Sequence, residues 1–147
     1  MADWTGIRAA IAATAAAVSG IEEGTSTDLS NVVLTPCVKI THVESAIIDD
    51  SGGGRGAGFE ARLATIRGEL VVAKTADIGR AMPNVETYCE DLTVAYRTGL
   101  QLGYTGVVQD SWLDSWEAGD LEYGGVTYAG ASLTFKVKVR ENVTRTA

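Results

Sequence analysis

The chain has 147 residues, of which 46% are hydrophobic and 21% are charged. This composition is typical of one globular domain and excludes a disordered chain. The net charge of −7 disfavours tight binding to nucleic acid, because the average surface would repel phosphates. No apolar run is long enough to span a bilayer, and the alanine-rich start lacks the basic segment of a signal peptide. We therefore expect synthesis in the cytoplasm and no membrane partner.

An alanine-rich helix is predicted at the N-terminus. Asp3 is a suitable N-cap, and apolar residues recur every three or four positions over 4–21. The positions between them are mostly alanine, which would allow the helix to lie close to a sheet or to a neighbouring subunit. Gly20 and Gly24 are expected to end this helix.

A long hairpin is predicted next, with strands over 32–50 and 59–74. The glycine-rich run at 51–58 is expected to form its tip, because glycine is costly to order inside a regular element. Gly68 suggests a bulge or a change of face in the return strand. The tip and the residue that follows it are candidate interaction residues: Gly52, Gly53, Gly54, Arg55 and Phe59.

The second half is predicted to contain one helix and two strands. Val85, Cys89, Leu92 and Tyr96 lie on one helical stripe, with Pro83 interrupting a short turn before it. Strands follow over 106–116 and 126–141, joined through 118–120 and a glycine pair. The sequence thus predicts a single α+β domain over 1–147, with a mostly antiparallel four-stranded sheet, helices packed on one face, and the order α-β-β-α-β-β.

The sequence shows no recognisable catalytic or metal site. His42 is the only histidine, and Cys37 and Cys89 lack metal-ligand spacing, so two buried free thiols are expected. The glycine run precedes a strand and not a helix, which argues against a phosphate loop. Paired acids such as those at 49–50, 90–91 and 110 with 114 are interpreted as solvated. We expect no enzyme, no cofactor and no metal.

Four aromatic residues in the last third are candidate contact residues. Trp112 and Trp116 are four apart and are expected on the same face of their strand, one in the core and the other as an interface anchor. Tyr123 and Tyr128 flank the glycine pair, and simple packing across a hairpin is the alternative interpretation for them.

The chain resembles the tail terminator proteins of long-tailed, siphovirus-type bacteriophages. The features that carry this resemblance are the alanine-rich first helix, the hairpin with its glycine tip at 52–58, the helix at 88–102, and the run EYGGVTYAG at 122–130 leading into LTFKVKV at 133–139. The resemblance covers nearly the whole chain.

The resemblance implies a homo-hexameric ring in the virion neck. This ring would cap the head-proximal end of the tail tube, end tube growth, and contact both the tail tube protein and a head-closure or connector protein. Genomic DNA would only pass through the pore, and Asp49, Asp50 and Asp120 are candidates for its acidic lining. Two alternatives stay open: another neck component, such as a head-closure or head-tail adaptor protein, and a small-ligand-binding α+β domain.

Overall fold

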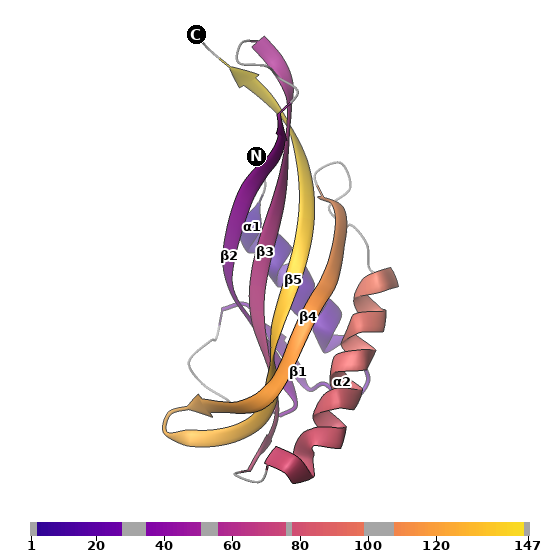
Figure 1. Ribbon diagram of the computed structural model, residues 1–147, viewed down its shortest axis with the longest axis vertical. Coiled ribbons are helices and arrows are strands. Elements are labelled where there is room, and N and C mark those ends of the chain that lie inside the picture. The colour runs from indigo at the N-terminus through magenta and orange to yellow at the C-terminus, as the bar shows by residue number, and fades with distance from the viewer. Residues whose placement is uncertain (1–2, 28–34, 51–55, 76–77, 99–107, 146–147) are drawn as a thin grey trace.

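Five strands form one mixed, mostly antiparallel sheet in the computed structural model, which describes residues 3–27, 35–50, 56–75, 78–98 and 108–145. The order across the sheet is β1-β2-β3-β5-β4, and only the β1–β2 pair is parallel (Figure 1). The strands are β1 (Glu23–Thr25), β2 (Cys37–Asp50), β3 (Gly56–Lys74), β4 (Val108–Tyr123) and β5 (Val126–Arg145). Two helices, α1 (Trp4–Ala16) and α2 (Ile78–Thr98), complete the described chain.

Both helices pack on one face of this sheet and share one hydrophobic core with it. The phenol of Tyr96 on α2 donates a hydrogen bond to the carbonyl of Ile11 on α1, and its ring packs edge-to-face on Phe135 of β5 at 4.8 Å between centroids. The expected inward residues of the last strand are confirmed as buried: Leu133, Phe135, Val137 and Val139. We call this side of the sheet the helix face and the other side the open face.

The first helix is shorter than expected, and a strand was missed after it. Asp3 caps α1 as predicted, accepting a hydrogen bond from the backbone N–H of Gly6 at 3.0 Å. The helix ends at Ala16, and Gly24 lies in β1 instead of ending the helix. A Cβ at Gly24 would lie 2.1 Å from the carbonyl oxygen of Ala12, so glycine is what allows β1 to approach α1 this closely. The prediction of four strands was wrong because it did not include β1.

The second helix is continuous through Pro83, which the sequence interpretation had placed as an interruption. Proline removes only one backbone donor, while the buried stripe continues on its C-terminal side. That stripe is confirmed: Val85, Cys89, Leu92 and Tyr96 are all buried.

β2 and β3 form the expected antiparallel pair, with differences at both ends. β2 begins at Cys37, and residues 28–34 of the expected strand lie outside the described residues. β3 begins at Gly56, so the last glycines of the run belong to this strand and not to a tip. The irregularity predicted at Gly68 lies in β2 instead, between Ile40 and Val43, and both of these β2 residues contact the core.

β4 is longer than predicted and runs straight through the expected connection at 118–120. These residues pair with β5, because Ala118 lies opposite Ala131 and Gly119 opposite Gly130. The paired β4 and β5 then curl across the sheet at their hairpin end, at the lower left of Figure 1. The curl divides the open face into a covered part and an uncovered part.

Candidate functional site

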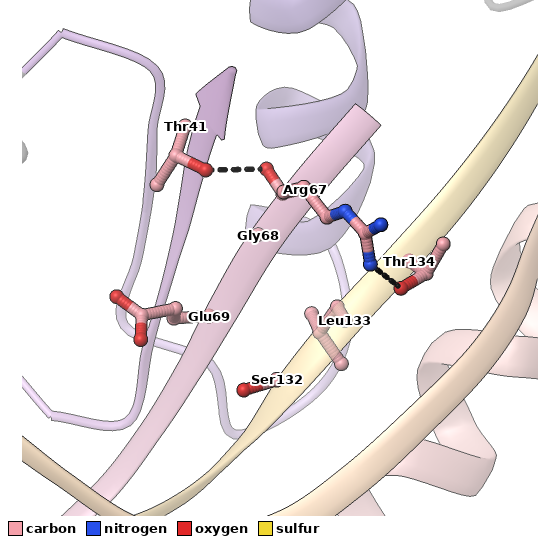
Figure 2. A pocket seen from close by; sticks show the side chains of 7 residues that line it. All are labelled: Thr41, Arg67, Gly68, Glu69, Ser132, Leu133 and Thr134. Carbon is pink, nitrogen blue, oxygen red and sulfur yellow. Dashed lines mark hydrogen bonds between the residues drawn. The ribbon is translucent and has the colours of Figure 1, made fainter. Parts of the chain in front are cut away.

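The uncovered part of the open face carries a shallow groove of about 420 Å³ along β3 and β5 (Figure 2). The Thr41 hydroxyl donates to the carbonyl of Arg67 at 3.0 Å, across the irregular stretch of β2. Arg67 in turn donates from Nη1 to the Thr134 hydroxyl, also at 3.0 Å. These two bonds thus join residues that line the groove, whose full lining is Thr41, Arg67, Gly68, Glu69, Ser132, Leu133 and Thr134.

Basic residues follow the two central strands across this face. They alternate with buried residues of the helix face, so their side chains lie on the open side. Lys136 is anchored by a 2.7 Å hydrogen bond from Nζ to the hydroxyl of Thr65. We call this set the basic ridge: Arg67, Lys136, Lys138 and Arg140.

Acidic residues flank the basic ridge on the two outer strands. Glu44 lies opposite Thr65 on the β2 side, and Glu117 lies opposite Ser132 on the β4 side, both exposed. A second hollow of about 410 Å³ opens between Arg67 and Glu117. The open face is thus basic at Arg67 and along β5, with acidic side chains at Glu69 and at the two margins.

The covered part of the open face holds a buried polar cluster under the curled hairpin. The Tyr123 phenol donates to a carboxylate oxygen of Glu69, and the Nζ of Lys39 lies 5.6 Å from the centroid of the Tyr123 ring. Lys39 is only 2% exposed. Burial, followed by the hydrogen bond to Glu69 and its negative charge, raises the pKa of Tyr123 well above its ordinary value. The phenol therefore remains a donor throughout the neutral range.

The two tyrosines of the hairpin pack on each other, as the alternative interpretation predicted. The rings of Tyr123 and Tyr128 meet edge-to-face with centroids 6.2 Å apart. Tyr123 also anchors the hairpin to β3 through Glu69, a contact that the sequence interpretation did not include.

The expectation that Trp112 and Trp116 share a face was wrong. A bulge between Leu113 and Ser115 shifts the register of β4 by one residue. Trp116 consequently lies opposite Leu133 and packs against the core, whereas Trp112 lies opposite Lys136 on the open face. The indole N–H of Trp112 donates to Asp114 at 3.1 Å.

The other candidate residues lie outside the groove and outside the cluster under the hairpin, or outside the described residues. Gly52, Gly53, Gly54 and Arg55 lie outside the described residues. Phe59 lies in β3 opposite Asn142, and the pore candidates Asp49 and Asp50 lie near the end of β2 opposite Ala61 and Glu60. Asp120 is exposed on β4, opposite Ala129.

Both thiols are free and buried, as predicted. Burial raises the pKa of Cys89 to about 12, and burial also raises that of Cys37 against the lowering effect of Lys39. Both are therefore protonated and poorly nucleophilic near neutral pH. In the described ranges, no group of three or more His, Cys, Asp and Glu side chains is arranged to hold a metal ion.

No protein-family model matches the chain, and no curated protein is similar to it in sequence. Among the described residues, neither helix combines the length and the apolar character needed to cross a membrane.

The basic ridge and the cluster under the hairpin were both missed from sequence. The alternation of Lys136, Lys138 and Arg140 with apolar residues was visible, but it gave no indication that Arg67 would join them. That juxtaposition depends on the β3–β5 register, which places Arg67 opposite Thr134.

Proposed function

We propose that the chain is a tail terminator, a structural virion protein of a long-tailed phage. Six copies would form a ring at the head-proximal end of the tail tube, end tube polymerisation, and join the tail to the head-closure or connector protein. The protein would be made in the host cytoplasm and would act as a part of the assembled neck.

The length of the central strands is the observation that carries this proposal. β3 and β5 have 19 and 20 residues, whereas α1 and α2 have 13 and 21. At about 3.3 Å per strand residue and 1.5 Å per helix residue, the strands are roughly 60 Å long and the longer helix roughly 30 Å. Figure 1 shows the strands continuing beyond the helices at the end that carries the C-terminus. A sheet that extends this far beyond its helical layer is suited to being covered by a neighbouring subunit.

The two outer edges of the sheet also favour assembly. Within the described residues, β4 has a strand neighbour on one side only, and the outer side of β2 is paired only through three residues with β1. Long unpaired edges promote association in a free monomer, and they become contact surfaces in an oligomer. Two different patches on one subunit permit head-to-tail contacts, which close into a ring when the rotation between subunits allows it.

Passage of DNA through the ring is compatible with the net charge of −7. Acids at the pore would repel the duplex and prevent it from sticking. Asp49, Asp50 and Asp120 are the candidate pore acids, and of these Asp120 is exposed on β4. Lysine variants at these positions that assemble and release DNA at the wild-type rate would count against this part of the proposal.

A tube-growth assay tests the proposed function. Tail tube protein from the same phage is allowed to polymerise with and without a substoichiometric amount of this chain, and tube length is measured. We expect growth to stop early and the chain to co-sediment with the tubes. Pull-downs with tube protein and with portal-side proteins provide the comparison. Retention only by portal-side proteins, with unchanged tube length, would favour a head-closure or adaptor protein.

A further inference from the structure

We propose that the basic ridge on the open face of one copy binds the outer face of α2 from the next copy, which makes this contact the subunit interface of the ring. This inference rests on the proposed function and specifies the surfaces through which it would be carried out. The occupant of the open face is thus a second copy of the same chain.

The outer face of α2 is acidic along its middle. Glu86, Glu90 and Asp91 are exposed there, on the side of the helix away from the buried Val85, Cys89, Leu92 and Tyr96. Val94 is 54% exposed and lies between Glu90 and Asp91 around the helix axis. Among the described residues, Val94 is the one large hydrophobic side chain that is exposed. The face therefore combines negative charge with an apolar contact.

The basic ridge is opposite in charge to the middle of the outer face of α2. The ridge consists of four basic side chains, whereas Glu86, Glu90 and Asp91 make the middle of α2 acidic, and Arg80 and Arg97 lie near the ends of the helix. In a chain with a net charge of −7, a cluster of basic side chains such as this ridge can attract an acidic helix.

The dimensions of the two surfaces agree. The ridge lies on β3 and β5, between the flanking strands β2 and β4. Three strand spacings of about 4.8 Å give a width of roughly 14 Å, which accommodates a helix of about 10–12 Å in diameter. The half-buried Trp112 on this face offers an apolar surface that suits Val94.

Such a contact is head-to-tail, because the ridge and α2 are different patches of the same chain. α2 would be held between the helix face of its own sheet and the open face of the neighbouring sheet. Repeated around an axis with a rotation that closes, the contact gives a ring of alternating sheet and helix layers.

Charge reversal on each surface tests the inference by sedimentation velocity. The ridge variant is R67E/K136E and the helix variant is E86K/E90K. In each variant like charges would meet across the contact, so we expect self-association at least about tenfold weaker than wild type. An equimolar mixture of the two should regain the wild-type assembly, and so should a chain that carries all four substitutions.

Control variants separate this effect from misfolding and from net charge. E22K/E122K makes the same change in net charge as E86K/E90K, at exposed acids outside α2, and should associate like wild type. Circular dichroism should show native secondary structure in every variant. If R67E/K136E alone fails to fold, the contrast between E86K/E90K and E22K/E122K still tests the helix side of the contact.

Three results would overturn the inference. Wild-type assembly that neither reversal weakens would place the ring contact elsewhere and leave the proposed function intact. A loss of duplex DNA binding in R67E/K136E, with unchanged self-association, would identify the ridge as a polyanion site. A wild-type chain that sediments as a monomer would also overturn it, and the tube-growth assay would then show whether the proposed function fails as well.

Discussion

At the scale of single residues, Tyr123 fixes how the β4–β5 hairpin lies on the sheet. Its phenol donates a hydrogen bond to Glu69 on β3, and its ring makes a cation–π contact with Lys39 on β2. One side chain from the hairpin thereby contacts two strands of the open face. The cluster satisfies polar groups that the curl of the hairpin buries.

Replacement of Tyr123 by phenylalanine should destabilise the protein by roughly 1–2 kcal/mol, because Glu69 loses a donor in a partly buried position. Tyr128→Phe is the matched control, since its ring stays in the same aromatic pair and none of the described hydrogen bonds uses its hydroxyl. Urea unfolding of both variants measures the difference. Equal stability of the two variants would show that the bond to Glu69 contributes nothing.

Because Cys89 is buried, we expect the protein to lose stability in alkaline solution. Burial raises its pKa from 9.0 to about 12, so above pH 9 the unfolded chain loses a proton that the folded chain keeps. The free energy of unfolding should therefore fall between pH 9 and pH 12. Between pH 8 and pH 10, Cys89 should account for about 1 kcal/mol of that fall.

Cys89→Ala removes this contribution. The variant will be less stable than wild type at both pH values because of the cavity it creates, but its change between pH 8 and pH 10 should be smaller. Urea unfolding at the two pH values measures this. An identical change in wild type and variant would contradict the assignment.

At the scale of the elements, Gly119 of β4 and Gly130 of β5 differ in how much space surrounds them, and we expect substitutions at the two positions to differ in cost. Gly119 and Gly130 lie opposite each other, but a Cβ at Gly130 would lie 2.0 Å from the carbonyl oxygen of Leu70, whereas a Cβ at Gly119 would meet nothing within 4 Å. Gly130→Ala should cost about 1–3 kcal/mol or more, because backbone must move. Gly119→Ala should change stability by less than about 0.5 kcal/mol. Thermal unfolding that ranks the two in the reverse order would contradict this packing.

The sequence predicted the elements with strong periodicity. The buried stripe of α2, the N-cap of α1 and the alternation of β5 are local patterns, and all three are present. β1 was missed because three residues are too few to show a period, and Gly24 reads as a helix stop until the approach of Ala12 is known. Residues 118–120 resemble a turn, but pairing with β5 holds them in a strand.

The candidate site was less predictable, because it depends on register. A single bulge near Asp114 moves Trp116 to the core and leaves Trp112 on the open face, and one sequence does not reveal such a bulge. The ridge and the Tyr123 cluster likewise unite residues that are more than 50 positions apart.

At the scale of the whole molecule, three features of the sheet favour the proposed assembly. Its central strands continue beyond the helices, its outer edges lack strand partners over long stretches within the described residues, and its open face carries a basic ridge where the outer face of α2 is acidic. These features are spread over opposite sides of the subunit. They are consistent with a chain that completes its structure by head-to-tail association.

Electron microscopy of the purified chain mixed with the tail tube protein of the same phage tests the ring most directly. We predict six-fold rings seated at one end of each tube, with no rings at the other end. Uncapped tubes of unlimited length beside free compact particles would contradict it.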